Sequence, residues 1–353
     1  MVKKYGFISL LEELSNAFGP PGFEDDIREI VIRELDKYVD ETRIDALGNV
    51  IAIKKGNEDL PVIMLDAHMD EIGFLITHID KKGFLRFHVL GGVDPRILYG
   101  QKVMIKGSKG YVKGYIGAKA PHLLKPEETK QAIPLDQLFI DIGAASEEEV
   151  FDTGIEIGSV GVFDTKFTKL SEYRVLGKAF DDRAGLTALI TVMKEVQNSE
   201  YNIIAVASVQ EEVGLRGAKT AAWQIEADVA LALEGTAAAD TPGTPEHKIS
   251  TSLGAGPAIT IADRALIAHP RVVRLLVKTA KENNIPYQFK KAVVGGTDAG
   301  AIHLTKGGIP AGVISVPARY IHSAASIIDL RDLENMVTLV LHFIKEASVA
   351  FKR

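Results

Sequence analysis

The chain has 353 residues with a net charge of −6, of which 46% are hydrophobic and none is cysteine. The absence of cysteine excludes disulfides, thiolate catalysis and sulfur-ligated metals, so histidine and carboxylate must hold any metal. The acidic balance argues against a nucleic-acid partner, no apolar run has the roughly 18 residues of a membrane-spanning helix, and the cytoplasm is the expected location.

Both ends of the chain predict α/β structure. Apolar residues recur with a helical period over 7–18, where "GPPG" follows, and over 24–39. The runs "NVIAIKKG" and "PVIMLDAH", at 49–56 and 61–68, predict strands. The later part alternates in the same way, and its expected elements are a helix at 181–196, strands at 202–209 and 228–233, a helix at 269–284, a strand at 311–317 and a helix at 332–351.

The middle of the chain has a different pattern. From about Ile72 to Phe167 the sequence consists of short alternating runs punctuated by glycine, which predicts a compact β-rich module with little helix. The length exceeds the usual limit of one hydrophobic core. We therefore predict an α/β domain made of residues 1–71 and 166–353, interrupted by an inserted β-rich domain of residues 72–165.

Histidines and carboxylates recur where the predicted elements begin or end. Such residues follow four predicted strands and open one predicted helix, and they are His68 with Asp70, Asp181 with Asp182, Glu211 with Glu212, Glu234, and His322. Taken singly, each has an ordinary explanation as a solvated turn, a helix cap or a buried histidine. Ligands of open α/β sheets bind outside the carboxyl ends of the strands, so these side chains are expected in one crevice.

The residue types indicate a metal site. Imidazole and carboxylate suit Zn²⁺, Co²⁺ or Mn²⁺. The five candidate ligands are His68, Asp181, Glu212, Glu234 and His322. A single tetrahedral zinc takes four ligands at most, so five fit two metals better if one carboxylate bridges them.

The adjacent glutamates of "SVQEEVG" are predicted to have different roles at this site. Two neighbouring like charges disfavour each other's ionisation unless a cation lies between them. One glutamate can bind metal while the other serves as general base, and strand alternation would send the two side chains different ways. The glycine-rich stretch "VVGGTDAGAIH", at 293–303, matches no nucleotide fingerprint and is interpreted as a turn lining the crevice.

Five motifs together resemble the M42 metalloaminopeptidases, the tetrahedral (TET) aminopeptidases. They are "AHMDEIGF", "KAFDDRAG", "VQEEVGLRGA", "ALEGTAAADTPGTPEHK" and "GGTDAGAIHLTKGGIP" with "SVPARYIHS". The resemblance runs nearly end to end and in order. It implies a mixed-sheet α/β/α fold and an exopeptidase that cleaves amino-terminal residues from short peptides with two divalent ions, zinc or cobalt.

The resemblance also assigns roles. His68 and Glu234 would bind one metal, Glu212 and His322 the other, and Asp181 would bridge. Catalysis would fall to Glu211 as general base, with Asp70 orienting the His68 ring. Asp182 would support the helix start. In the family the position of Glu234 is often aspartate, and the longer glutamate is expected to alter the metal geometry.

The family further implies assembly through the β-rich module. That module would be a PDZ-like dimerisation domain, and dimers would build a hollow tetrahedral dodecamer that admits small unfolded peptides. Two alternatives stay open at this point. The same site could serve a deacylase, a deacetylase or a glycan-active hydrolase, or the chain could be a non-catalytic scaffold that keeps the fold.

Overall fold

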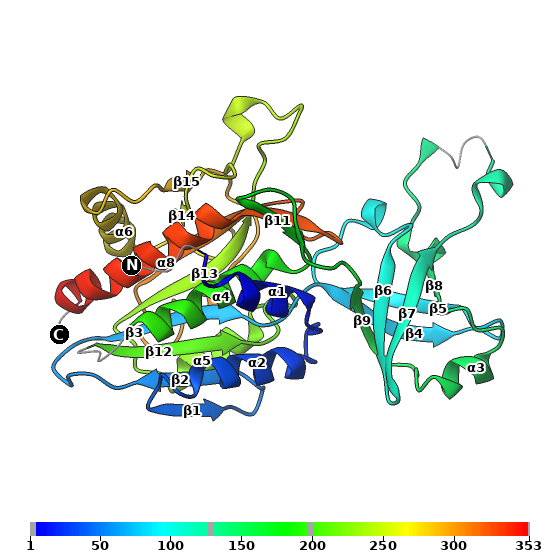
Figure 1. Ribbon diagram of the computed structural model, residues 1–353, viewed down its shortest axis with the longest axis horizontal. Coiled ribbons are helices and arrows are strands. Elements are labelled where there is room, and N and C mark those ends of the chain that lie inside the picture. Colours follow the sequence, from blue (N-terminus) through cyan, green and yellow to red (C-terminus); the bar gives the residue numbers. More distant parts are fainter. Residues whose placement is uncertain (1–4, 126–129, 197–200, 352–353) are drawn as a thin grey trace.

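The computed structural model describes residues 5–125, 130–196 and 201–351. Among these residues, strands of the α/β part form one 11-stranded mixed sheet, and a second group of strands forms a closed barrel (Figure 1). The sheet and the barrel lie side by side. The expected fold class, a mixed-sheet α/β fold with an inserted β unit, is confirmed.

The central sheet has the order β1-β2-β12-β3-β13-β16-β17-β11-β10, with β14 and β15 branching from β16. Strands β12, β3, β13 and β16 are parallel neighbours, so their carboxyl ends lie at the same edge of the sheet. The strands are β1 (Glu41–Ile44), β2 (Val50–Lys54), β3 (Val62–His68), β10 (Thr168–Lys169), β11 (Arg174–Gly177), β12 (Asn202–Ser208), β13 (Val229–Ala237), β14 (Ala258–Thr260), β15 (Gln288–Lys290), β16 (Ala311–Arg319) and β17 (Ser326–Asp329).

Helices cover both faces of this sheet because its strands alternate apolar residues to the two sides. Ile63 and Leu65 of β3 join the core beneath α1, α2, α4, α6 and α8, whereas Met64 joins the core beneath α5 and α7. The helices are α1 (Ile8–Asn16), α2 (Asp25–Leu35), α4 (Phe180–Glu195), α5 (Arg216–Gln224), α6 (Pro270–Glu282), α7 (Ala299–Ile302) and α8 (Leu330–Ala350). All the helices predicted for this part of the chain are present, with ends shifted by a few residues.

The inserted barrel is closed in the order β4-β5-β8-β7-β6-β9 and has its own hydrophobic core. Its elements are β4 (Gly73–Ile79), β5 (Leu85–Leu90), β6 (Lys102–Gly107), β7 (Gly110–Gly117), β8 (Phe139–Asp141), helix α3 (Glu147–Asp152) and β9 (Val160–Phe163). These strands fall within residues 72–165. The division of the chain into domains at those residues stays a prediction.

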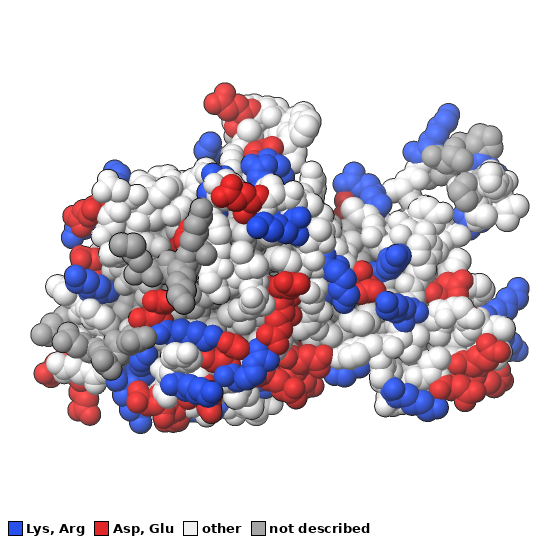
Figure 2. Space-filling view, viewed as in Figure 1, with Lys and Arg blue, Asp and Glu red and all other residues white. Residues whose placement is uncertain are grey.

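Acidic and basic side chains are interspersed over most of the face of the molecule shown in Figure 2. Within the described ranges, none of the helices is both long and apolar enough to cross a bilayer.

Candidate metal centre

Strand register brings the first site residues to one level of the sheet. Asp66 of β3 pairs with Val206 of β12 and with Ala232 of β13, and two residues later His68 pairs with Ser208. Glu234, two residues beyond Ala232, therefore lies level with His68 and on the same face. His68 Nε2 lies 3.8 Å from Glu234 Oε2. Glu234 sits inside β13 rather than after its end, because that strand continues to Ala237.

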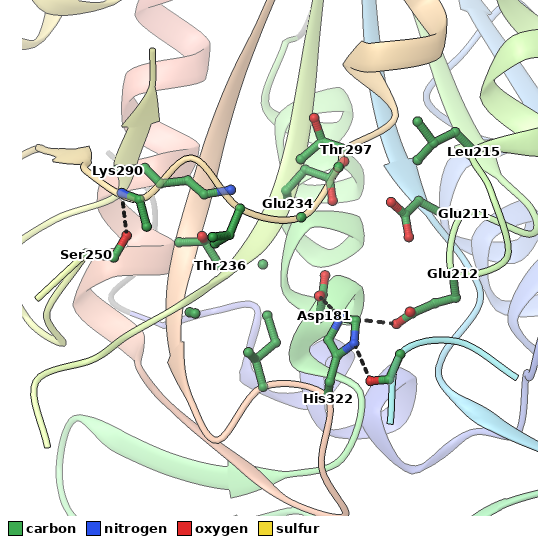
Figure 3. A pocket seen from close by; sticks show the side chains of 18 of the residues that line it. Asp181, Glu211, Glu212, Leu215, Glu234, Thr236, Ser250, Lys290, Thr297 and His322 are labelled. Carbon is green, nitrogen blue, oxygen red and sulfur yellow. Dashed lines mark hydrogen bonds and ion pairs between the residues drawn. The ribbon is translucent and has the colours of Figure 1, made fainter. Parts of the chain in front are cut away.

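Asp181 joins two histidines from distant parts of the chain. Its Oδ1 lies 3.4 Å from His68 Nε2, and its Oδ2 lies 3.3 Å from His322 Nε2. Glu212 Oε1 lies 3.7 Å from His322 Nε2 (Figure 3). Two triads result, His68–Asp181–Glu234 and Asp181–Glu212–His322, each with its ligand atoms within 4.8 Å of one another.

A further carboxylate faces this pair of triads. Glu211 Oε2 lies 3.8 Å from His68 Nε2, and the side chains of both Glu211 and Glu212 line the same cavity. The prediction that strand alternation separates these two glutamates was wrong, because β12 ends at Ser208 and both lie in the turn after it. They diverge within that turn instead, Glu211 toward His68 and Glu212 toward His322.

Two buried carboxylates fix the turn that carries the glutamates. Asp70 Oδ1 accepts the Glu211 N–H at 2.9 Å, and its Oδ2 accepts the Glu212 N–H at 3.0 Å. Glu24 Oε1 accepts the N–H of Gln210, which precedes them with a φ of +56°, at 3.1 Å. Three consecutive amides are thus held by side-chain carboxylates, and the first of them belongs to Gln210, whose backbone conformation few side-chain-bearing residues adopt.

The histidine contact predicted for Asp70 is the weaker of its interactions. Its Oδ1 lies 3.4 Å from His68 Nδ1, which is closer to the backbone oxygen of Asp70 at 3.1 Å. Asp182 also has a tie to this histidine, because its Oδ2 accepts the His68 N–H at 3.2 Å while its Oδ1 accepts the Gly185 N–H at 3.0 Å. Support of the helix start by Asp182 agrees with its expected role.

The barrel side of the molecule orients the second histidine. His322 Nδ1 lies 2.8 Å from the carbonyl oxygen of Gly92, in the loop after β5. A carbonyl only accepts, so Nδ1 carries a hydrogen, and Nε2 is the ring nitrogen that faces Asp181 and Glu212. A Cβ at Gly92 would lie only 3.1 Å from Nδ1, which explains the glycine there.

The pKa values reflect crowded negative charge. Burial, with repulsion from Glu234, raises the pKa of Glu211 well above its usual value although His68 opposes this. Burial alone would lower the pKa of His68, but Glu211, Asp181 and Asp70 outweigh it and raise that pKa. Burial similarly opposes the rise at His322, whose pKa Glu212 and Asp181 bring to about 10. The pKa of Asp181 is lowered instead. Burial alone would raise it, but the hydrogen bonds with the two imidazoles outweigh burial.

Sequence reasoning missed two buried acids behind the first triad. The Ser208 hydroxyl lies 2.6 Å from Asp298 Oδ2 and 3.2 Å from Asp66 Oδ1, and the Asp298 N–H donates to Glu234 Oε1 at 3.1 Å. Burial raises the pKa of both aspartates. The available signal was an aspartate inside the apolar run "PVIMLDAH" and another in "GGTDAG", the stretch whose residues 294–297 line the cavity as expected.

Asp181, Glu211, Glu212, Glu234 and His322 line a cavity of about 460 Å³. The donors are oxygen and imidazole nitrogen, the set that suits zinc, cobalt or manganese. The donor set therefore fits divalent metal, and the fold and site together define a metal-dependent hydrolase.

Comparison with known proteins gives the family. The family model described as M42 glutamyl aminopeptidase matches residues 48–339, so the chain belongs to this family. A putative aminopeptidase of Acetivibrio thermocellus is 44% identical over 95% of this chain and 97% of its own length. The resemblance expected from the sequence motifs is confirmed.

Solved structures of peptidases agree with this family assignment. An aminopeptidase from the archaeon Desulfurococcus kamchatkensis superposes with a TM-score of 0.94 at 42% identity, over 98% of this chain and 96% of that one. The TET1 peptidase of Pyrococcus horikoshii is described as assembling into a tetrahedron or a large octahedral shell. It superposes with a TM-score of 0.85 at 37% identity, over 96% of this chain and 98% of that one.

Substituting Asp70 tests whether its carboxylate positions the turn that carries Glu211 and Glu212. In Asp70→Asn one carboxylate oxygen becomes an amide nitrogen that cannot accept the Glu211 or Glu212 N–H, so kcat on an aminoacyl-p-nitroanilide is expected to fall about 10- to 100-fold. Steady-state kinetics with zinc or cobalt measure this effect. The matched control is Asp59→Asn, an exposed aspartate that should leave kcat unchanged. An unaltered kcat in Asp70→Asn would contradict the role of that carboxylate.

Proposed function

We propose that the protein is an aminopeptidase that removes amino-terminal residues from short peptides, using two divalent metal ions and Glu211 as general base. The observation that carries the proposal is the pair of triads that share Asp181, with the Glu211 carboxylate beside them. Membership of the M42 family supports the same activity.

His68 and Glu234 would hold one ion, His322 and Glu212 the other, and Asp181 would contribute one oxygen to each. Zinc or cobalt fits these donors. When bound, such ions supply the Lewis acidity that makes water nucleophilic near neutral pH and polarises the scissile carbonyl.

The protein's own groups would move the proton and position the peptide. The Glu211 carboxylate accepts a proton from the attacking water and delivers it to the departing amine. The acidic wall of the cavity attracts the positively charged amino terminus of a peptide, which favours exopeptidase action. Asp70 accepts the Glu211 N–H and Glu24 accepts the N–H of the preceding Gln210, and these bonds hold the backbone of the turn during this transfer.

The alternative functions, a deacylase, deacetylase or glycan-active hydrolase and a non-catalytic scaffold, gain no support from the site. Hydrolysis of a glycosidic bond by paired carboxylates does not need two histidines bound to one aspartate, and no described feature favours a deacylase. A scaffold that lost catalysis should lack a ligand or the base, whereas His68, Asp181, Glu211, Glu212, Glu234 and His322 are all present.

Assembly and location belong to the same proposal. Residues 72–165 would form a PDZ-like domain through which subunits dimerise, leaving residues 1–71 and 166–353 as the catalytic domain, and dimers would build a tetrahedral dodecamer. The likeness to the TET1 peptidase of Pyrococcus horikoshii supports this arrangement. We place the protein in the cytoplasm.

Glu211→Gln tests the general base. The amide cannot take a proton from water, so kcat should fall about 10²- to 10⁴-fold while the two metal sites keep their ions. Steady-state kinetics and metal analysis by emission spectrometry measure the two quantities. Glu58→Gln, at an exposed position, is the control. Full activity in Glu211→Gln would show that another group carries the proton.

Metal removal tests the chemistry itself. Dialysis against a chelator should abolish hydrolysis of aminoacyl-p-nitroanilides, and Zn²⁺ or Co²⁺ should restore it as two ions bind per chain. Metal content is measured beside each rate. Hydrolysis that persists in protein shown to be metal-free would rule out the proposed mechanism.

The assembly is tested by particle mass. Multi-angle light scattering of the full chain, with its metal, is expected to give the mass of a dodecamer at micromolar concentration. A monodisperse monomer or dimer over this concentration range would contradict the tetrahedral arrangement while leaving the catalytic proposal intact.

A further inference from the structure

A cluster of three buried charges lies outside the active-site cavity, beside the segment that carries Asp181. Glu71, Lys178 and Arg183 are each at most 2% exposed, and none of the three lines the cavity. Lys178 Nζ lies 2.6 and 2.8 Å from the two carboxylate oxygens of Glu71, and Arg183 Nη2 lies 3.4 Å from Oε1 of the same glutamate. One carboxylate therefore joins two cations that flank Asp181 in the sequence.

Backbone carbonyls at the end of α1 and just after it add further contacts to this cluster. Lys178 Nζ donates to the Ala17 carbonyl at 2.7 Å, and Arg183 Nη1 donates to the Leu14 carbonyl at 2.9 Å. The backbone N–H of the glutamate donates to the Gly19 carbonyl at 3.0 Å. The cluster is thus attached to a part of the fold that carries none of the predicted metal ligands.

The segment between the two cations is not a regular helix. Ala179 has a φ of +57°, which few residues with a side chain adopt, and Asp181, with φ −88° and ψ 105°, lies outside the helical region. Regular helical hydrogen bonding therefore does not by itself fix Asp181. Lys178, three residues before Asp181, and Arg183, two residues after it, instead attach both ends of the segment to Glu71.

Glu71 also connects this segment with the turn that carries the two adjacent glutamates. It directly follows Asp70, whose carboxylate accepts the N–H groups of Glu211 and Glu212. Asp181 belongs to both triads. The contacts of Glu71 therefore help to set where this shared residue lies relative to Glu211 and Glu212.

Stability alone is a weak reason for three charges at this position. Buried ion pairs lose their hydration, and apolar side chains of similar volume often stabilise a fold as well or better. The neighbouring residues Leu14 and Phe180 are fully buried and belong to the hydrophobic core, so apolar packing is available here. Charge-assisted hydrogen bonds differ from apolar contacts in fixing the geometry of their partners, which is the property that a ligand-carrying segment needs.

We propose that Glu71, acting through Lys178 and Arg183, is a positioning residue that holds Asp181 where it can contribute an oxygen to each of two metal ions. This inference rests on the two-metal site of the proposed function. Loss of the cluster should weaken the joint binding of two ions while the fold persists. Because Glu71 and Lys178 do not line the cavity, any effect of their substitution on metal affinity must be transmitted through the backbone.

Lys178→Met is the first variant, because methionine has a similar length and leaves Glu71 paired with Arg183. The metal-free full chain is titrated with Co²⁺, and the visible absorbance of the bound ion is followed. The wild-type protein should bind two ions, and Lys178→Met should bind the second about 10- to 100-fold more weakly, the cost typical of losing a group that orients a metal ligand. Thermal unfolding of the metal-free chains, measured beside each titration, should be nearly the same.

Two further variants complete the test. Glu71→Gln keeps the shape of the side chain but removes the charge that binds both cations, so it should weaken binding of the second ion at least as much. Glu34→Gln is the matched control. Glu34 pairs with Lys194 at the other end of α4, so its loss should leave the affinity for both ions unchanged.

Wild-type affinity for both ions in either variant of the cluster that folds would overturn this inference and leave the proposed function standing. Unfolding of both variants would also overturn it, because the cluster would then serve stability, as would an equal loss of affinity in Glu34→Gln. A wild-type chain that binds fewer than two ions would overturn the proposed function and this inference together. A chain that binds two ions but hydrolyses no aminoacyl substrate would overturn the aminopeptidase function alone.

Discussion

The site depends on the crowding of buried carboxylates around two imidazoles. Asp181 contacts both His68 and His322, while Glu211, Glu212 and Glu234 approach the same two rings. Burial, together with repulsion from neighbouring carboxylates, raises the pKa values of Glu211 and Glu234. Charges this close destabilise a fold unless something positive lies among them. The central sheet is rigid enough to hold this arrangement, because its parallel strands are covered by helices on both faces.

Few of the decisive groups lie on strands, so a network of hydrogen bonds must hold them. Gln210 and His322 both have positive φ values, a conformation that is uncommon without glycine. Glu24, Asp70 and the Gly92 carbonyl supply the compensating bonds. The reactive side chains are therefore positioned from outside their own segments, by α2, by the loop after β3 and by the barrel.

Much of this could be predicted from the sequence because apolar periodicity marks strands, and a polar residue at a strand end is easy to see. The five metal-ligand candidates fall into two triads for that reason. The site residues that the sequence did not predict are those whose position depends on strand register and on burial in the folded protein. Asp66 and Asp298 look like ordinary polar residues until β3 and α7 place them behind Glu234. The paths of Glu211 and Glu212 depend on where β12 ends, which periodicity locates poorly.

The bond between His322 and Gly92 is one of several contacts between the α/β part and the barrel, which also meet where Lys106 and Tyr111 contact Asp26. Gly91, beside it, lies so close to Glu212 that a methyl group there would fall 2.9 Å from Oε2. The barrel is consequently more than an appendage that recombination could exchange at will. Any domain that replaced the barrel would have to place a carbonyl oxygen beside His322 Nδ1 and a residue without a side chain beside Glu212. The sequence of the insertion is therefore constrained at the loop that contacts His322.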